Sequence, residues 1–206
     1  MDNSTENIIL LKARALFLKY GVKSVSMDDI AKELAMSKKT LYQYFDGKKD
    51  LITRIIQHYI TEEMEVVNHI QLVASDAVDE MIGIARYVID FITNLEPSLT
   101  YDLRKYYPHS WSLIQEGHMG FVEETITRNI ERGKKEGVYR QEIQTHIIAK
   151  LYVSNSMNIV LMQLPDKDIK PVNLYKEMIH YHLHGLMTHK GKQIFKDNKT
   201  RTYAKV

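Results

Sequence analysis

The fold of this chain is decided by residues 26–45, which read SMDDIAKELAMSKKTLYQYF. Ser26 and Ser37 each precede a short helical pattern, and serine is a preferred N-cap because its hydroxyl accepts a backbone N–H at a helix start. Ile30 and Leu41 place apolar side chains where the two helices would cross. The stretch therefore predicts two short helices joined by a tight turn, which is a helix-turn-helix with residues 37–45 as its second helix.

The outer face of that second helix is polar and suits contact with DNA, since its free N–H groups and side chains can reach phosphates and base edges. Tyr42 and Tyr44 are two residues apart and cannot share a face. We expect Tyr42 to donate its hydroxyl to a phosphate and Tyr44 to reach a base edge or the neighbouring sugar-phosphate. Lys48, at the start of the next helix, adds an ammonium group. The other outer-face residues are Ser37, Lys38, Lys39, Thr40 and Gln43, with Lys39 and Gln43 as candidate base readers. The alternative is a small helical subdomain with solvated lysines and two packing tyrosines.

The rest of the chain is also predicted to be helical. Apolar residues recur at helical spacing, and Gly21, Asp46-Gly47, Pro97, Pro108 and Pro165 interrupt the pattern. No alternating strand pattern, internal repeat or low-complexity tract is present. The fold class is therefore all-α, with an N-terminal three-helix helix-turn-helix domain and a larger helical domain. The predicted segments are 1–48 for the first domain, 49–189 for the second and 190–206 for a basic, weakly ordered tail. Within the second domain, 109–135 is expected to be one helix.

Composition narrows the class of protein. The chain has 206 residues and no cysteine, which excludes disulfides, thiolate-zinc sites and a cysteine nucleophile. No signal peptide or membrane-spanning run is visible, so a cytoplasmic location is expected. Residues 1–60 hold ten Lys/Arg against seven Asp/Glu, and residues 189–206 hold six against one. The stretch between them is acidic, with 12 against 18. This distribution favours DNA contact at the basic N-terminal end.

The N-terminal motifs resemble the TetR family of bacterial transcription regulators. The similarity runs over about residues 8–55 and is carried by Ile9, Phe17 and Gly21 with the segments 26–31, 37–45 and 48–51. It implies three N-terminal helices for DNA, a divergent ligand-binding and dimerisation domain, and repression relieved by a small molecule. The phosphate and base contacts of the family fall here on Ser26, Lys38, Lys39, Thr40, Tyr42, Tyr44 and Lys48. One residue departs from the family. Ala35 stands where the turn usually has glycine or asparagine, and a left-handed alanine costs about 1 kcal/mol.

The middle of the chain is rich in aromatic and methionine side chains that could line a small-molecule pocket. A filled core is the alternative for each of them. Arg104, Lys105 and His109 could attract an acidic ligand but are equally plausible as surface charges. The ligand-binding candidates are Tyr87, Phe91, Tyr106, Tyr107, Trp111, Met119, Phe121, Tyr152, Met157 and Met162.

The helices at about 141–164 and 172–188 are the candidates for the dimer interface. In the TetR family the corresponding helices pair with their symmetry mates as a four-helix bundle, which lets two recognition helices meet successive major grooves of a palindrome. The alternative is that both helices only cover the core of the monomer. The candidate interface residues are Leu151, Ser154, Ile159, Leu183 and Leu186.

Three histidines at 180, 182 and 184 raise the possibility of a metal site. His180 and His184 share a helix face and could chelate, but His182 points elsewhere and no well-placed carboxylate completes the set. Surface or interface histidines are favoured, so no metal and no cofactor are expected. Gly-rich phosphate loops and credible catalytic pairs or triads are also missing, which argues against an enzyme.

Two functions remain for this sequence. The first is a repressor that forms homodimers, binds double-stranded DNA and is released from it by an unidentified small-molecule effector, with no membrane partner. The second is a DNA-binding scaffold protein of the same fold that recruits a protein partner without a small molecule. Neither the effector, the operator nor the choice between repression and activation follows from the sequence. The basic tail could contact nucleic acid, although a solvated end is the simpler interpretation.

Overall fold

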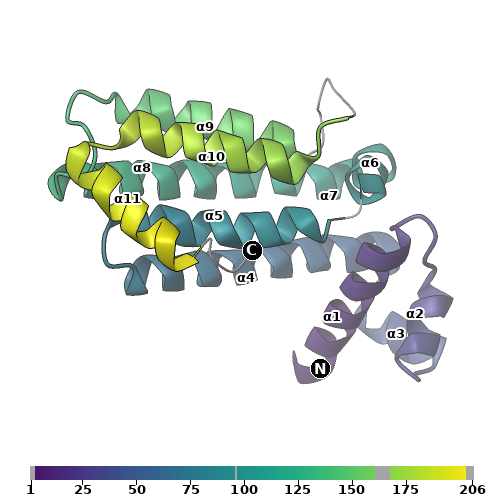
Figure 1. Cartoon of the computed structure of the whole chain (residues 1–206). Coiled ribbons are helices and arrows are strands. Elements are labelled where there is room, and N and C mark those ends of the chain that lie inside the picture. Colours follow the sequence, from purple (N-terminus) through teal and green to yellow (C-terminus); the bar gives the residue numbers. More distant parts are fainter. Residues whose placement is uncertain (1–2, 96, 161–167, 203–206) are drawn as a thin grey trace. The chain divides into compact units, whose positions relative to one another are not determined.

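The computed structural model describes residues 3–95, 97–160 and 168–202, and these residues form two compact units. The first unit comprises Met1–Glu63 and Asn94–His118, and the second comprises Met64–Thr93 and Met119–Val206. Helices dominate both units (Figure 1). Within the described ranges there is no β-strand, only one isolated antiparallel bridge between Tyr139 and Met187. The all-α prediction is therefore confirmed.

The first unit holds the predicted helix-turn-helix and two helices from later in the chain. Its core contains Ile9, Ala13, Phe17, Ile30 and Leu41, all at most 4% exposed, so the spacing of apolar residues in the N-terminal pattern does mark the buried face. The long helix α4 begins in this unit and continues into the second. The elements are α1 (Asn3–Tyr20), α2 (Met27–Glu33), α3 (Lys38–Tyr44), α4 (Lys48–Val73), α6 (Pro97–Tyr106), α7 (Pro108–Leu113) and the π-helix Ile114–His118.

The π-helix corrects the expectation of one continuous helix from 109 to 135. The observed segment begins with α7, and Pro108 occupies its first turn, where a missing N–H costs no hydrogen bond. Five residues then form the π turn before α8 (Met119–Lys135) continues. Nδ1 of His118 lies 2.8 Å from Oε2 of Glu63, a carboxylate that is only 6% exposed. Apolar periodicity does not distinguish an α-helix from a single wider turn, so the π-helix could not be predicted from it.

The second unit packs α5 (Ala77–Thr93) against α8, α10 (Pro171–Leu186) and α11 (His189–Thr202), with α9 (Thr145–Val160) against α8 and α10. Figure 1 shows α9 and α10 side by side.

One corner of this core is fixed by a close approach between the backbone of α8 and a buried aromatic ring. Gly133 of α8 faces the ring of Tyr139, where an added Cβ would overlap the ring. The Tyr139 hydroxyl donates to the carbonyl of Ala77 at 3.0 Å, and the Asn129 amide donates to the same carbonyl at 2.9 Å. Glycine is therefore required where α8 passes this buried tyrosine.

The C-terminal segment is helical, which corrects the prediction of a weakly ordered tail from 190. Helix α11 packs on α5 (Figure 1), and Phe195 is 7% exposed within the core of the second unit. Gly191 is also buried, and an added Cβ there would overlap the carbonyl oxygen of Val138. A few apolar contacts thus hold a segment whose composition is otherwise polar and basic. Among the helices described, none has the length and apolar character needed to span a membrane.

Candidate nucleic-acid interface

Helix α2 begins at a complete capping box. Ser26 is the N-cap, and its hydroxyl accepts from the backbone N–H of Asp29 at 3.1 Å. The Asp29 carboxylate in turn accepts from the backbone N–H of Ser26 at 2.8 Å and from its hydroxyl at 2.6 Å. These hydrogen bonds hold the pKa of Asp29 below its usual value. The Ser26 hydroxyl, which the family resemblance assigns to DNA, is thus already part of the local structure.

The turn between α2 and α3 contains a left-handed alanine. Ala35 has φ +51°, the only positive value at a non-glycine residue in the described ranges. Its N–H bonds the carbonyl of Lys32 at 3.1 Å, and the N–H of Met36 bonds that of Ala31 at 3.0 Å. This pair of bonds is the Schellman pattern that ends many helices. The strain expected from the sequence is therefore present, since the position favours glycine.

Helix α3 has one buried and one exposed face. Leu41 and the following Phe45 are at most 1% exposed and anchor the helix on the core. Ser37 caps the helix by accepting from the N–H of Thr40 at 3.0 Å. Tyr42 is 45% exposed, whereas Tyr44 is half-buried with its ring 6.5 Å from that of Phe45, so the two tyrosines do lie on different faces. Of the predicted DNA contacts on α3, the exposed ones are Lys38, Lys39, Tyr42 and Gln43, and the half-buried ones are Thr40 and Tyr44.

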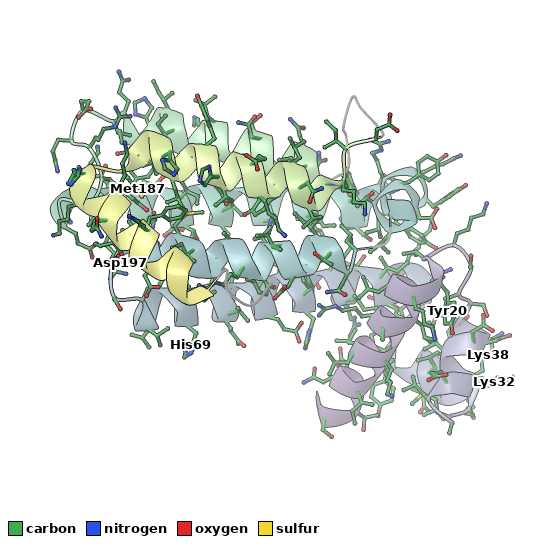
Figure 2. All side chains as sticks on the ribbon, viewed as in Figure 1. Tyr20, Lys32, Lys38, His69, Met187 and Asp197 are labelled. Atoms are coloured by element: carbon green, nitrogen blue, oxygen red, sulfur yellow. The ribbon has the colours of Figure 1, made fainter. Side chains whose placement is uncertain are left out.

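The first lysine of α3 forms an ion pair with α2. Nζ of Lys38 lies 2.7 Å from Oδ1 of Asp28, and both side chains are more than half exposed. The hydrogen bond to Asp28 raises the pKa of Lys38. Figure 2 labels Lys38 at the outer edge of these helices, near Lys32. The outer face of α2 and α3 therefore carries a carboxylate beside a cation that the sequence assigned to phosphate.

Lys48, the first residue of α4, is directed toward the loop before α2. Its Nζ donates to the carbonyl of Lys23 across 3.5 Å and lies 5.8 Å from the centroid of the Phe17 ring. Burial lowers the pKa of Lys48, and the carboxylates of Asp102 and Asp29 oppose that shift. The sequence did not reveal this half-buried setting, because it depends on a contact between residues 25 positions apart.

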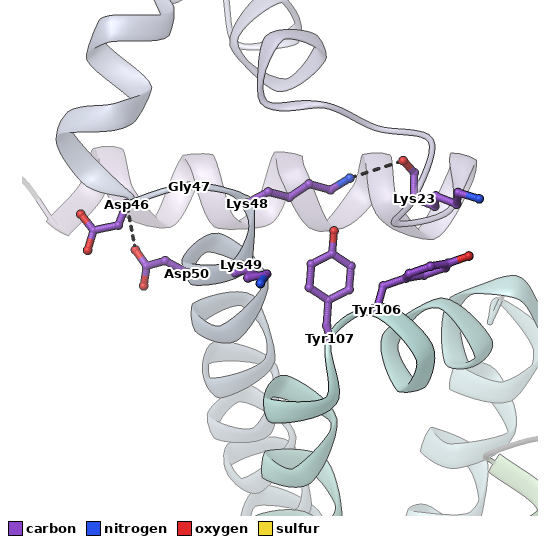
Figure 3. Close-up of a pocket in the computed structure, with 8 residues that line it drawn as sticks. All are labelled: Lys23, Asp46, Gly47, Lys48, Lys49, Asp50, Tyr106 and Tyr107. Carbon is purple, nitrogen blue, oxygen red and sulfur yellow. Dashed lines mark hydrogen bonds between the residues drawn. The ribbon is translucent and has the colours of Figure 1, made fainter.

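A cleft of about 560 Å³ opens beside Lys48 (Figure 3). Tyr106 and Tyr107, two of the predicted ligand residues, form part of its wall. The backbone N–H of Lys23 donates to Oδ2 of Asp102 on α6 at 3.0 Å. Burial raises the pKa of the Tyr107 hydroxyl, and the nearby Asp102 carboxylate adds to that shift. The residues lining the cleft are Lys23, Asp46, Gly47, Lys48, Lys49, Asp50, Tyr106 and Tyr107. Sequence reasoning missed both the cleft and Asp102.

The other predicted ligand residues are distributed over both units. Trp111 is buried in the first unit at 7% exposure. In the second unit, Tyr152 and Met157 are buried, and the Tyr152 hydroxyl lies 2.8 Å from that of Tyr175. The half-buried members of the second unit are Tyr87, Phe91, Met119 and Phe121. Met162 lies outside the described residues.

The candidate interface residues fall into two groups. Leu151 is 53% exposed and Ser154 is also exposed, so both are available to a partner. Ile159, Leu183 and Leu186 are at most 4% exposed and belong to the core of their own unit. The sequence predicted all five for the dimer interface, but helical spacing does not specify whether a partner or the chain's own core buries an apolar position.

The histidines of α10 do not form a metal site in the part of the chain described, where no group of three or more potential ligands is present. The rings of His180 and His184 lie 4.4 Å apart, as their spacing predicts. His182 instead packs its ring 4.9 Å from that of Tyr152, and burial lowers the pKa of His182 to about 4.

Comparison with known proteins agrees with this architecture. Residues 9–55 match the family model described as bacterial regulatory proteins, tetR family. An HTH-type transcriptional regulator of Staphylococcus aureus (strain USA300) is 47% identical over 45 residues, which cover 22% of this chain and 24% of that regulator. The match thus spans about a quarter of the curated relative.

Solved structures extend the similarity to the whole fold. The reduced form of NemR from E. coli aligns with a TM-score of 0.75 at 12% identity, covering 90% of this chain and 98% of that one. A Saccharomonospora viridis protein described as a transcriptional regulator, solved in complex with choline, aligns with a TM-score of 0.69 at 17% identity, covering 91% and 100%. At these identities the structures show a shared fold.

Proposed function

Because this chain belongs to the TetR family of bacterial transcription regulators, we propose that it binds a palindromic operator as a homodimer and is released by a small-molecule effector. The exposed polar face of α3 carries the proposal. Leu41 and Phe45 hold the helix on its core, while Lys39, Tyr42 and Gln43 remain exposed. An exposed helix of this kind is the element that helix-turn-helix proteins place in the major groove.

The proposed contacts divide by chemistry. Tyr42 donates its hydroxyl to a phosphate, and Lys38 reaches another once it leaves Asp28. Gln43 and Lys39 read base edges, because an amide and an ammonium suit adenine and guanine respectively. Thr40, Tyr44 and Ser37, the N-cap of α3, add phosphate or sugar contacts. Lys48 contributes a cation at the edge of the same face.

The proposed dimer interface lies on exposed residues of α9 and α10. Ile147, Leu151 and Ser154 follow one another at i, i+4 and i+7 on α9, and the two apolar members are 43% and 53% exposed. Tyr181 on α10 is 83% exposed. Large exposed apolar side chains of this kind are suited to burial by a partner. Two copies joined here would present two recognition helices to successive grooves.

The proposed effector site lies among the aromatic and methionine residues of the second unit. The half-buried rings of Tyr87, Phe91 and Phe121 support an organic ligand, since such rings line many small-molecule sites. The choline bound by the Saccharomonospora viridis protein indicates that this fold accepts a small organic molecule. Effector binding would favour a conformation that fits the operator poorly.

A second candidate is the scaffold protein that recruits another protein. The C-terminal end of α4 supports it, because Leu72 and Val73 are 83% and 62% exposed. On this alternative, DNA binding is retained and no small molecule weakens it.

The DNA-binding proposal is tested by selecting a sequence from a random DNA pool and measuring fluorescence anisotropy over a salt series. Tyr42→Phe removes one hydroxyl and is compared with Tyr101→Phe, which makes the same change at an exposed tyrosine of α6. Lys48→Ala is compared with Lys176→Ala, an exposed lysine on α10. We expect Tyr42→Phe and Lys48→Ala to weaken binding, and Lys48→Ala to reduce the salt slope by about one unit. Sequence-indifferent binding that ignores both substitutions contradicts the proposal.

The dimer is tested separately by sedimentation equilibrium. Leu151→Glu places a charge on the proposed interface, and His146→Glu introduces the same residue at an exposed position on another face of α9. We expect Leu151→Glu to shift the wild-type dimer toward monomer and His146→Glu to leave it dimeric. A monomeric wild type, or a dimer that tolerates Leu151→Glu, rules out this interface.

A further inference from the structure

The cleft beside α4 contains three lysines, none of which forms an ion pair with the described carboxylates. Nζ of Lys48 has one long hydrogen bond, to the carbonyl of Lys23, although an ammonium group has three donors. Nζ of Lys23 lies 5.3 Å from the centroid of the Tyr106 ring. Lys49 is exposed at the rim. On the lysine side of the cleft, the ammonium groups therefore retain N–H donors that a ligand can use.

The carboxylates of Asp50 and Asp102 near the cleft accept hydrogen bonds from groups other than these lysine ammonium groups. Oδ2 of Asp50 accepts from the backbone N–H of Asp46, and its Oδ1 accepts from Nε of Arg54. The Asp102 carboxylate accepts from the backbone N–H of Lys23. Figure 3 shows the side chains of Asp46 and Asp50 on the side away from Tyr106, with the Lys48 ammonium directed toward Lys23. One side of the cleft thus remains positive.

The surface of the cleft is largely apolar, and two aromatic residues are among those that line it. Tyr106 is the last residue of α6, Tyr107 follows it as the N-cap of α7, and both face the cleft (Figure 3). A volume of about 560 Å³ lies within the range of about 300–1,000 Å³ that small-molecule sites occupy. A bare inorganic ion would leave most of this apolar surface uncovered.

We propose that this cleft binds a small organic anion, whose carboxylate or phosphate group is held by Lys23 and Lys48 and whose apolar body packs against Tyr106 and Tyr107. The site differs from the proposed effector site in the second unit, because all of its lining residues belong to the first unit. Lys48 is shared between the anion and the proposed DNA contact, so the bound anion competes with the operator for this lysine. That consequence rests on the proposed function, whereas anion binding itself does not.

The test uses 4-fluorobenzoate as the probe and measures its binding to the full chain by 19F NMR without DNA. Lys48→Gln and Tyr106→Ala alter the cleft, and Lys176→Gln is the matched lysine control in the second unit. 4-Fluorobenzyl alcohol serves as the neutral probe of similar shape, and inorganic phosphate as the anion without an apolar body. Circular dichroism melts verify that each variant is folded. Tyr106 is 37% exposed, so its replacement carries little risk to folding.

We expect wild type and Lys176→Gln to bind 4-fluorobenzoate equally and Lys48→Gln to weaken it by about tenfold, the effect of losing one charged hydrogen bond. Tyr106→Ala should weaken binding by several-fold, and the neutral probe should bind less well than the anion. The proposal is overturned if wild type does not bind the probe, or if the cleft variants bind as wild type does. Equal binding of the alcohol, or displacement by inorganic phosphate at the same concentration as the probe, also overturns it.

Discussion

The backbone N–H of Lys23 is held by the carboxylate of Asp102 across 3.0 Å, although 79 residues separate them in the chain. Asp102 is only 8% exposed. The bond joins the loop that precedes α2 to helix α6 within the same compact unit. A charged acceptor therefore fixes the main chain immediately before the helix-turn-helix.

Loss of this acceptor should destabilise the first unit. Asp102→Ala leaves the Lys23 N–H without its partner, and we expect a loss of about 2 kcal/mol in the free energy of unfolding. Asp102→Asn keeps an oxygen that can accept and should cost less. Urea unfolding followed by circular dichroism measures both, with Glu65→Ala as an exposed control expected to change stability by no more than about 0.5 kcal/mol. If Asp102→Ala behaves like the control, the bond contributes nothing.

The ion pair between Lys38 and Asp28 should oppose DNA binding. Asp28→Asn removes a negative charge from the face proposed to meet phosphate and releases Lys38 from its partner. On the proposed function we expect the affinity for DNA to rise about threefold at 0.15 M salt, with a smaller gain at higher salt because exposed charges are screened. Anisotropy measures the effect. Asp197→Asn on α11 makes the same substitution at another exposed aspartate and should leave affinity unchanged; a weaker complex with Asp28→Asn contradicts the prediction.

The left-handed alanine predicts a stabilising substitution. Ala35→Gly relieves a conformation that costs an L-residue about 1–2 kcal/mol, although glycine also gives the unfolded chain more freedom. The net gain should be about 0.5–1 kcal/mol by urea unfolding. The same change at Ala15, which is exposed within α1, should instead lose about 1 kcal/mol. Two effects of the same sign would show that backbone strain at residue 35 is not significant.

Two glycines of α8 should respond oppositely to alanine. Gly133→Ala drives a Cβ into the Tyr139 ring, and that ring is fixed by its hydroxyl bond to Ala77, so a loss of about 2–3 kcal/mol is expected. Gly120→Ala meets no atom within 4 Å and should gain about 0.5–1 kcal/mol through helix propensity. Thermal melts compare the pair. A tolerated Gly133→Ala would mean that Tyr139 can move.

His182 should make stability depend on pH below neutrality. Burial lowers its pKa to about 4, whereas the unfolded chain takes up a proton near the ordinary value of 6.5. The stabilisation by neutral His182 is therefore complete above pH 6.5 and is lost as the pH falls from 6.5 toward 4. Between pH 7.5 and 5.0 the loss should approach about 2 kcal/mol, because each unit is worth at most about 1.4 kcal/mol.

The measurement for His182 is urea unfolding at both pH values. His182→Phe keeps the ring beside Tyr152 but cannot titrate, so its stability should fall less than that of wild type. His146→Phe, at an exposed position of α9, should retain the pH dependence of wild type. Equal pH dependence in wild type and His182→Phe would assign the effect to other groups.

Most of the fold could be predicted from the sequence, because caps, glycines and prolines act locally. Ser26 and Ser37 cap helices as expected, and Pro108 begins one. The π turn at Ile114–His118 was missed since apolar spacing tolerates one wider turn. Helix α11 was missed because Phe195 in the core and Ile194 packed against it outweigh a polar composition.

The candidate site was predictable only where one helix determines it. Helical spacing alone predicts an exposed face of α3, on which Lys38, Lys39, Tyr42 and Gln43 are exposed, whereas Thr40 and Tyr44 are half-buried. The surroundings of Lys48 depend on Lys23 and Asp102, which approach it through tertiary packing. Leu183 and Leu186 were predicted for the dimer interface but lie in the core of their own unit, because spacing does not distinguish a core from an interface.

The shortness of α3 limits how much sequence one protomer can recognise. Its seven residues, Lys38–Tyr44, span about 10 Å, which corresponds to about three or four base pairs of DNA. A target of that length recurs by chance about once in 64 to 256 positions, so a bacterial genome contains many thousands of copies. On the proposed function, a single protomer would thus be distributed over many chance copies of its short target sequence. Only two copies reading one site together multiply their discrimination enough to mark an individual promoter.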